Sequence, residues 1–268
     1  KLGALGRGLD NALGISRRAA KGMEKRLVQH HRACRTVLAS RIDDQLQAER
    51  AVGSGRVRPY RLGLDSVQFH PNHRDKDAFF QRFAIPPGAV VLLFVGRLDA
   101  GKNVMLLAEA VARANAAGAP LFLLAAGKGP AENDLRRLLG PRVSLPGFLN
   151  APELAAAYAG ADYLALPSMV ETWSLVAAEA LASGLPVIAA ASSGVGRFLG
   201  AEGAGLLVHA NTVEAWQSAL QDAAALPHPA ALRDAARRTA LAHFPSWEQA
   251  LIEDFVPVWQ RAAAETRG

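Results

Sequence analysis

The sequence predicts an α/β fold with a doubly wound parallel sheet, preceded by a partial α/β segment. Three observations predict it. From residue 77 onward short apolar runs alternate with longer stretches rich in Ala and Leu, the short runs are apolar rather than alternating, and Gly or Pro stands at most junctions. Strands that are apolar throughout belong to sheets covered on both faces. Such strands, when they alternate with helices, are typical of a doubly wound parallel sheet.

The expected elements follow one another in order along the chain. Strands are expected at residues 89–95, 121–126, 142–145, 163–166, 186–190 and 205–208. Helices are expected around them at residues 78–84, 103–117, 131–139, 152–159, 174–183, 212–225 and 246–264. In the last helix Ser246 is the N-cap candidate, and the apolar side chains recur at helical spacing.

The N-terminal part of the chain contains too little for an independent α/β domain. It is expected to form a basic helix, a strand, a second helix and a second strand, at residues 17–32, 35–39, 42–51 and 56–61. We therefore divide the chain into an N-terminal segment, a linker, an α/β domain and a C-terminal helix, at residues 1–62, 63–76, 77–245 and 246–268.

The composition indicates a folded globular protein. Half of the 268 residues are apolar, and a chain of this length can bury a sizeable core. Its single cysteine, Cys34, cannot form an internal disulfide. The longest apolar run, residues 89–95, is far shorter than the about 20 residues that a membrane-spanning helix needs.

The net charge of +6 is concentrated in residues 1–35, which hold nine Lys or Arg and two acidic residues. Two interpretations of the basic segment 13–35 stay open, namely contact with anionic lipid and a solvated helix face. No aromatic residues interleave with these cations, and we therefore expect no nucleic-acid partner.

The first candidate site is the segment GRLDAGKN, residues 96–103, which joins a strand to a helix. Glycine lets backbone N–H groups approach an anion, the helix N-terminus adds partial positive charge, and Arg97 and Lys102 add full charges. The spacing approaches that of a phosphate-binding P-loop, but Asn103 replaces the hydroxyl residue that would hold magnesium. A plain strand-to-helix turn with two surface cations is the alternative.

The second candidate site contains Glu179, the only polar side chain between Leu175 and Ala182. A helix that is apolar all round is buried, and a buried carboxylate needs a hydrogen-bond partner. A ribose diol is one such partner, while an arginine or a partly exposed helix edge is the alternative. Glu171 is expected at the carboxyl end of a strand, where ligands bind in open α/β sheets, although it could equally cap the next helix.

A D-x-D triplet, residues 75–77, stands before the first helix of the α/β domain. Such triplets can hold a metal ion, but a position directly before a helix favours N-capping. We therefore expect no metal site.

Together these motifs resemble the donor half of family 4 glycosyltransferases, which are retaining enzymes of the GT-B type with two Rossmann-like domains. The resemblance covers residue 35 to the end of the chain. It rests on VGRLDAGK (95–102), GKGP (127–130), LPGF (145–148), Pro167 and Ser168 before Glu171-x7-Glu179, and GLPV (184–187). Residues 37–40 and 60–71 resemble the end of the family's N-terminal domain and its linker.

The resemblance implies a role for each matching residue. Arg97 and Lys102 would hold the donor diphosphate and neutralise the charge on the leaving group, and Glu171 would lie beside the transferred sugar. Glu179 would bind the ribose hydroxyls, and Phe148 would frame the base. The remaining residues implied in donor binding are Gly96, Gly127, Thr172, Trp173, Ser174 and Leu175, of which the last four would offer backbone N–H groups.

Two departures from the family pattern concern the sugar pocket. Thr172, Trp173 and Ser174 stand where the family usually has small glycines, which predicts a narrower pocket. Residues 192–194 read SSG where a glycine pair is usual. The identity of the donor sugar therefore stays open.

The resemblance implies a retaining glycosyltransferase of hexosyltransferase type, represented here by its donor-binding part. The donor would be a UDP-, GDP- or ADP-sugar, the acceptor a glycan or lipid-linked molecule, and the pathway cell-surface polysaccharide or glycolipid synthesis. No metal or further cofactor is expected, and the expected location is cytoplasmic, peripheral on the inner face of the membrane. We expect little transfer by this chain alone.

Two alternatives belong to other classes. One is a non-catalytic nucleotide-sugar-binding subunit that needs a partner, and the other is a P-loop nucleotide hydrolase. Asn103 argues against the second.

Overall fold

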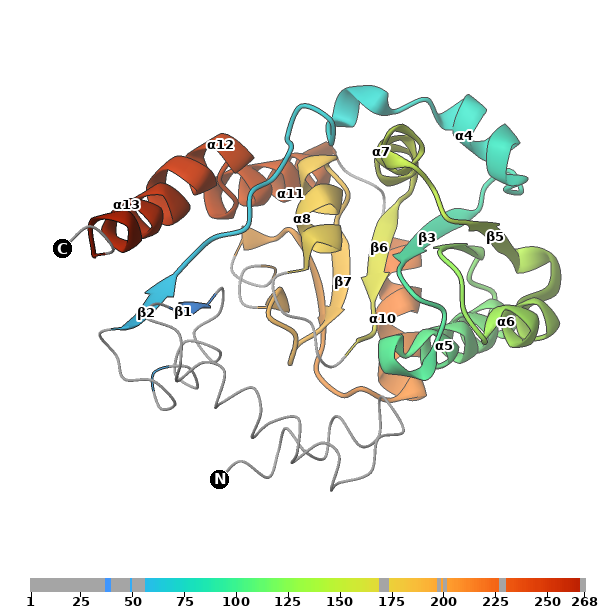
Figure 1. The fold of residues 1–268 in the computed structure, drawn as a ribbon. Coiled ribbons are helices and arrows are strands. Elements are labelled where there is room, and N and C mark those ends of the chain that lie inside the picture. Colours follow the sequence, from blue (N-terminus) through green and yellow to red (C-terminus); the bar gives the residue numbers. More distant parts are fainter. Residues whose placement is uncertain are drawn as a thin grey trace, which may run out of the picture. The chain divides into compact units, whose positions relative to one another are not determined.

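The chain divides into two compact units in the computed structural model, Lys1–Gly63 with Pro245–Gly268 and Leu64–Phe244. The larger unit carries a six-stranded sheet (Figure 1). The structure describes residues 37–39, 49, 56–168, 174–196, 199, 202–226 and 230–265.

The sheet of the larger unit is parallel throughout, with the strand order β5-β4-β3-β6-β7-β8. Its strands are β3 (Val90–Val95), β4 (Leu121–Ala126), β5 (Val143–Gly147), β6 (Tyr163–Leu166), β7 (Val187–Ala190) and β8 (Gly205–Val208). The chain builds outward from β3 to β5 and then returns to place β6 on the other side of β3. The strand order therefore reverses between β3 and β6, as in a doubly wound sheet.

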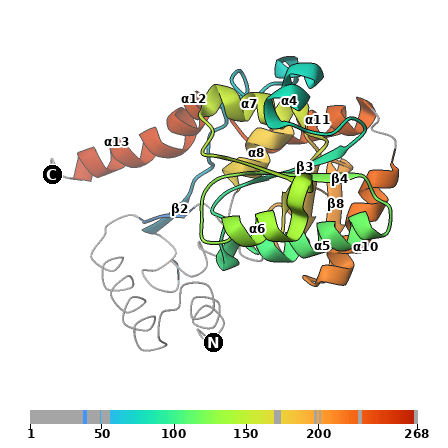
Figure 2. The same ribbon diagram turned by 90° about the vertical axis from the view of Figure 1, so that its right-hand side faces the viewer.

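Helices cover both faces of this sheet, so that the strands are buried on two sides. The helices are α4 (Lys76–Phe83), α5 (Val104–Ala116), α6 (Glu132–Leu139), α7 (Ala151–Gly160), α8 (Leu175–Ala182), α10 (Val213–Ala225) and α11 (Ala230–His243). Figure 2 shows α4, α7, α8 and α11 on one face and α5, α6 and α10 on the other. Successive residues of β3 alternate between the two cores, with Leu93 in one and Leu92 in the other. The predicted fold class is confirmed.

One helix of the larger unit, α11, is not among the expected elements. Its buried residues are small, namely Ala235, Ala236, Thr239 and Ala240, and they form no stripe of large apolar side chains. Two arginines of α11 donate to carbonyl groups at the ends of other helices. Arg233 donates to the oxygens of Ala159 and Ala161, at 2.7 and 3.1 Å, and Arg237 donates to that of Ala182. Cations at these positions also favour the helix dipoles.

The segment expected as a linker contributes to the core of the larger unit. Leu64 and Phe69 are buried, and Arg237 donates to the carbonyl oxygen of Phe69 at 3.0 Å. Asp75 accepts a hydrogen bond from the N–H of Ala78 at 3.0 Å and caps α4, as the sequence predicts.

In the smaller unit β1 (Val37–Ala39) pairs in parallel with β2 (Val57–Pro59). The second of these strands is shorter than the expected 56–61, and residues 35 and 36 of the first lie outside the described residues. The expected helices 17–32 and 42–51 also lie outside them, apart from Glu49. The expected C-terminal helix is present as α12 (Trp247–Ala250), a π-helical turn η5 (Leu251–Phe255) and α13 (Val256–Glu265).

Ser246 caps α12, where it and Gln249 form a capping box with distances of 3.1 and 3.0 Å. Asp254 of the π-helical turn accepts hydrogen bonds from the backbone N–H and the guanidinium of Arg61. Trp247 and Trp259 of this helical stretch are 45% and 57% exposed.

Candidate functional site

The candidate site lies at the carboxyl edge of the sheet, where the loops after β3, β4 and β5 are joined by backbone hydrogen bonds. The N–H of Gly96 donates to the oxygen of Ala126 at 3.0 Å, and the N–H of Gly127 donates to that of Gly147 at 2.8 Å. A Cβ on Gly127 would lie 1.9 Å from the oxygen of Gly96. Gly127 therefore allows the first two loops to touch, which is the structural reason for glycine at this position.

The loop after β3 presents Arg97 at the surface and ends in the turn η3 (Ala100–Lys102). The Arg97 side chain is 73% exposed, and its Nε donates to Asp99 Oδ2 at 2.7 Å. Asp99 Oδ1 accepts from the N–H of Lys102 at 3.1 Å. Burial disfavours the charged form of Asp99, but the hydrogen bonds from Arg97 and the loop backbone prevail and hold its pKa below the ordinary value. Asp99, which the sequence reasoning did not single out, thus holds the side chain of Arg97 and the backbone of Lys102.

Asn103 connects this loop to the neighbouring strand β6. Its backbone is left-handed, with φ +53°, and its Nδ2 donates to the oxygen of Pro167 at 3.2 Å. Asn103, which departs from the P-loop pattern, therefore joins the loop after β3 to the loop after β6. These two loops lie on the two sides of the strand-order reversal. Among the described residues, no group of three or more His, Cys, Asp and Glu could hold a metal ion.

Glu179 of α8 finds a partner that the sequence reasoning missed. Tyr158 of α7 is fully buried, and its hydroxyl donates to Glu179 Oε2 at 3.1 Å. Burial raises the pKa of Glu179, and this hydrogen bond acts in the opposite direction. The arginine considered as an alternative partner is not found among the described residues. A lone tyrosine in an otherwise Ala-rich helix was the available signal, because a buried hydroxyl also needs a partner.

Three of the predicted site residues, Glu171, Thr172 and Trp173, lie outside the described residues. Ser174 is buried, and its Oγ accepts from the N–H of Ala177 at 3.2 Å, which caps α8. Leu175 opens the helix and is partly exposed. The backbone roles implied for these residues stay predictions.

Phe148 follows β5 at the same edge of the sheet. Its side chain is 83% exposed, whereas the next residue, Leu149, is buried in the core. A large exposed aromatic ring at the edge of the sheet where ligands bind is suited to stacking on a planar group.

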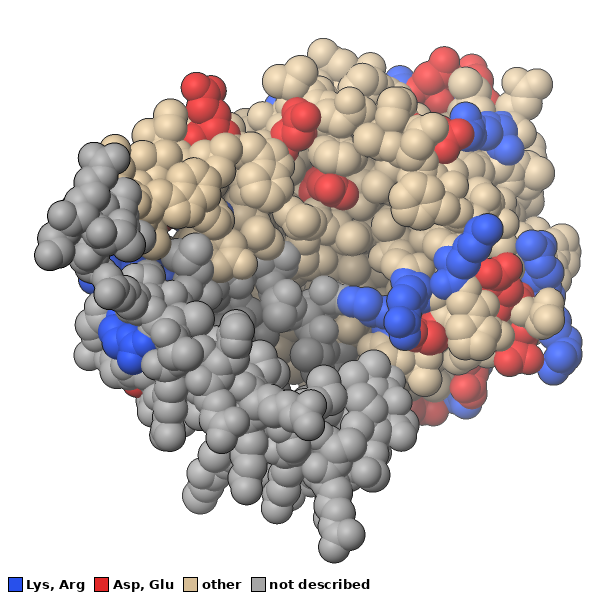
Figure 3. Space-filling view, in the orientation of Figure 1, with Lys and Arg blue, Asp and Glu red and all other residues tan. Residues whose placement is uncertain are grey.

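The surface over the end of β3 and the neighbouring helices α5 and α6 carries a group of Lys and Arg side chains, as Figure 3 shows. Asp and Glu side chains lie among them. On the described part of the face that Figure 3 shows, the positive charge of the candidate site is therefore local.

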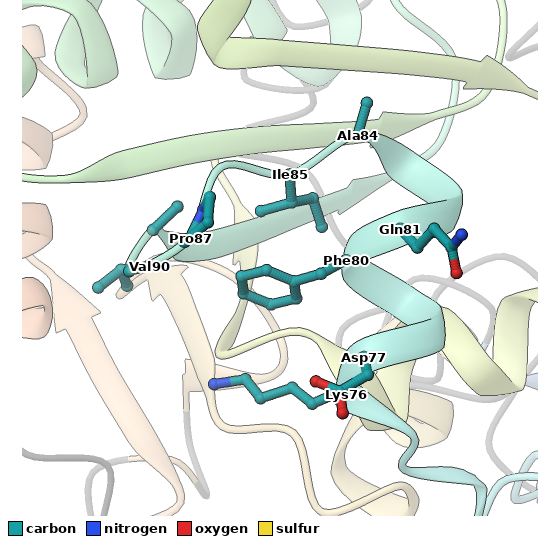
Figure 4. A pocket seen from close by; sticks show the side chains of 10 residues that line it. Lys76, Asp77, Phe80, Gln81, Ala84, Ile85, Pro87 and Val90 are labelled. Atoms are coloured by element: carbon teal, nitrogen blue, oxygen red, sulfur yellow. The ribbon is translucent and has the colours of Figure 1, made fainter.

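A cavity of about 770 Å³ lies elsewhere, between α4 and the beginning of β3 (Figure 4). Phe80, Ile85 and Pro87 line it, with Lys76 at one end. Because Val90 begins β3, this cavity stands at the amino edge of the sheet, opposite the predicted site residues. In doubly wound sheets ligands bind at the carboxyl edge.

These features define a class of protein. A parallel doubly wound sheet, with glycine-containing loops and basic residues at its carboxyl edge beside the strand-order reversal, is a Rossmann-like domain. The pattern of the family "Glycosyl transferases group 1" matches residues 75–239. The chain belongs to this family.

Relatives of known name agree with this assignment. The chain is 35% identical over 235 residues to the GDP-mannose-dependent alpha-mannosyltransferase of Mycolicibacterium smegmatis, covering 86% of this chain and 58% of that protein. It is 36% identical over 179 residues to the D-inositol 3-phosphate glycosyltransferase of Rhodococcus erythropolis, covering 62% and 40%. It is 32% identical over 168 residues to the sulfoquinovosyl transferase of Arabidopsis thaliana, covering 62% and 32%. The chain thus spans between about a third and three fifths of these relatives.

Solved structures show the same fold. Sucrose-phosphate synthase from Thermosynechococcus elongatus matches with a TM-score of 0.74 and 25% identity, covering 98% of this chain and 67% of that one. Anabaena HepE, solved with UDP and glucose, matches with a TM-score of 0.70 and 19% identity, covering 92% and 67%. The expected Rossmann-like fold of GT-B glycosyltransferases is confirmed. No helix in the described part of the chain has the length and apolar character to cross a membrane.

Proposed function

We propose that this chain is the donor-binding part of a retaining glycosyltransferase of family 4. It would transfer a sugar from a UDP-, GDP- or ADP-sugar to a glycan or lipid-linked acceptor, in the synthesis of cell-surface polysaccharide or glycolipid. No metal or further cofactor takes part in this proposal.

The observation that carries the proposal is the state of Glu179. One carboxylate oxygen, Oε2, accepts from a buried hydroxyl, while Oε1 has no hydrogen-bond partner among the described residues. Glu179 is half-buried, and a carboxylate of this kind is stabilised by a ligand that donates hydrogen bonds. The two hydroxyls of a ribose ring supply such donors, as in other doubly wound folds that bind nucleotides.

The diphosphate of the donor would bind to the loop after β3. Arg97 can turn from Asp99 toward a phosphate because its side chain is exposed, and Lys102 precedes the N-terminus of α5. Cations and a helix N-terminus at a leaving diphosphate stabilise the charge that develops as the sugar departs. This stabilisation is the contribution to catalysis that we assign to the donor side.

The contacts with the sugar and the acceptor rest on the resemblance. Glu171 and the backbone of residues 172–175 would face the sugar, and Phe148 would frame the base. Contact of residues 13–35 with an anionic membrane stays a prediction, since that segment lies outside the described residues.

The P-loop hydrolase receives no support from the geometry, because Asn103 bonds to Pro167 at the position where a metal ligand would be needed. A donor-binding subunit that requires a separate partner uses the same site. Capture of a separate acceptor-domain protein by the chain, with transfer only when the two proteins are mixed, would favour this subunit.

The test is calorimetric titration of the chain with UDP-, GDP- and ADP-glucose and with GDP-mannose. Arg97→Ala should weaken binding of the donor by about tenfold to hundredfold, the equivalent of one or two charge-assisted hydrogen bonds. Arg137→Ala is the matched control, because Arg137 is also exposed, at 79%, and is paired with Asp134. Absence of binding to all four donors would refute the proposal, and so would equal effects of the two substitutions.

The stereochemistry of transfer needs a separate measurement. With the acceptor-bearing part of the enzyme present, the anomeric coupling in the proton NMR spectrum of the first product should match that of the donor. An inverted product would contradict the retaining mechanism and leave the donor site unaffected.

A further inference from the structure

We propose that Tyr158 is a positioning residue, which fixes one oxygen of Glu179 so that the other is directed to the ribose hydroxyls of the donor. This inference rests on the proposed function, since it assigns a role to a second residue of the same site. Tyr158 itself would not touch the donor, because its side chain is fully buried.

The geometry around Tyr158 leaves its hydroxyl one partner among the described residues, which is Glu179 Oε2 at 3.1 Å. The ring of Phe69 packs against the ring of Tyr158 edge to face, with centroids 5.8 Å apart. A buried ring in such a contact has little freedom to rotate its hydroxyl to a different place. The phenol is therefore a fixed donor.

The two helices that carry this pair are held at their ends by one neighbouring helix. Arg233 of α11 donates to the oxygen of Ala159, the residue after Tyr158, at 2.7 Å. Arg237 of the same helix donates to the oxygen of Ala182, three residues after Glu179. Since both arginines belong to α11, their hydrogen bonds fix the spacing of α7 and α8. The separation between the Tyr158 phenol and the Glu179 carboxylate is fixed with it.

The chemistry of the pair suits recognition of a diol. A carboxylate accepts hydrogen bonds on both oxygens and offers no donor of its own. Because Oε2 accepts the hydrogen bond from Tyr158, the carboxylate cannot rotate freely. The lone pairs of Oε1 therefore keep a fixed orientation. Burial raises the pKa of Glu179, and the hydrogen bond from Tyr158 opposes that rise. Tyr158 therefore also helps to keep Glu179 in the charged form that accepts from ribose.

The experiment compares ribonucleotides with ligands that lack the two ribose hydroxyls. UDP, GDP and ADP and their 2′,3′-dideoxy counterparts are titrated into the full chain by calorimetry. The readout is the ratio of the dissociation constant of the dideoxy ligand to that of the ribose ligand. A merely structural defect weakens both ligands equally and leaves this ratio unchanged.

Three variants separate the roles. Glu179→Gln should reduce the ratio at least tenfold. Tyr158→Phe should reduce it at least threefold, while binding of the dideoxy ligand changes less than twofold. Tyr163→Phe is the matched control, because Tyr163 is also buried and its hydroxyl donates to the oxygen of Ala223 at 3.3 Å. It should leave the ratio unchanged.

The outcomes distinguish this inference from the function on which it rests. If Glu179→Gln leaves the ratio unchanged, the ribose site of the proposed function is wrong. If Glu179→Gln reduces the ratio and Tyr158→Phe does not, the positioning role is wrong and the ribose site stands. Should Tyr158→Phe weaken both ligands equally, the role of Tyr158 is only structural and the inference is overturned.

A second measurement follows the ratio as a function of pH. Loss of the hydrogen bond from Tyr158 should raise the pKa of Glu179. As the pH is lowered, Glu179 of Tyr158→Phe should therefore become protonated at a higher pH than in the unsubstituted chain. Discrimination between the ribose and dideoxy ligands should be lost at that higher pH. Coincident pH profiles would contradict the inference.

Discussion

Replacing Gly127 by Ala should destabilise the larger unit and separate two of the loops that form the candidate site. A Cβ at Gly127 would lie 1.9 Å from the carbonyl oxygen of Gly96 and 2.9 Å from its carbonyl carbon. Both are backbone atoms, which cannot rotate away as the end of a side chain can. The loops after β3 and β4 would therefore have to move apart, against the hydrogen bond from Gly96 to Ala126.

Two free-energy costs add in this substitution. Gly127 has φ +145°, and placing a residue with a Cβ in an unfavourable positive-φ region costs about 1–3 kcal/mol. Displacing packed backbone resembles overpacking of a core, which costs about 1–3 kcal/mol. The free energy of unfolding should therefore fall by about 2–6 kcal/mol, a large share of the about 5–15 kcal/mol of a typical protein.

Gly118→Ala is the control that isolates the first of these costs. Gly118 has φ +97°, and nothing lies within 4 Å of a Cβ built on it. Chemical denaturation followed by circular dichroism measures the free energy of unfolding of both variants. Calorimetric titration with UDP measures their affinity for the nucleotide. We expect Gly127→Ala to be the less stable variant by about 1–3 kcal/mol, with weaker binding of UDP. Equal loss of stability in the two variants would refute the close approach of the loops.

Three further predictions concern stability. Arg237→Met should lower the free energy of unfolding by about 2–4 kcal/mol in a denaturation assay, since buried carbonyl groups lose their donors. The control is Arg238→Met at the exposed neighbouring position, which should have little effect in the same assay. Asn150→Ala removes the capping box of α7 and should cost about 1 kcal/mol by denaturation, and an unchanged midpoint would contradict that cap. The hydrogen bond from Arg61 lowers the pKa of Asp254, so its stabilisation is present at neutral pH and is lost as the pH falls below about 4. Asp254→Asn should therefore make the melting temperature less sensitive to acid, and parallel pH profiles would show that the ion pair contributes nothing.

Much of the fold could be predicted because the strands are runs of apolar residues. β4, β6 and β8 have the predicted bounds, and Pro120 and Pro167 stand directly beside the first two of these runs. The helix α11 could not be predicted, because its buried face is made of Ala and Thr. Small residues suffice where helices approach closely, but they form no stripe of large apolar side chains in the sequence.

The candidate site could be predicted only in part. That Glu179 needs a partner follows from its apolar neighbours, which are local in sequence. The partner, Tyr158, stands 21 residues earlier, and its position depends on how α7 packs against α8, which no local pattern encodes. Asp99 was missed for another reason, because a single acidic residue between two cations has no distinctive spacing.

The hydrogen bond from Asn103 to Pro167 has a consequence for redesign of this protein. It ties the loop that carries Arg97 and Lys102 to the strand end from which the chain leads toward Glu171. An exchange of the segment after β6 with that of a relative, made to alter the sugar that is accepted, therefore has to keep a carbonyl group at residue 167 within reach of the Asn103 amide. Otherwise a graft intended to change the proposed sugar contacts would also disturb the loop that we propose to bind the phosphates.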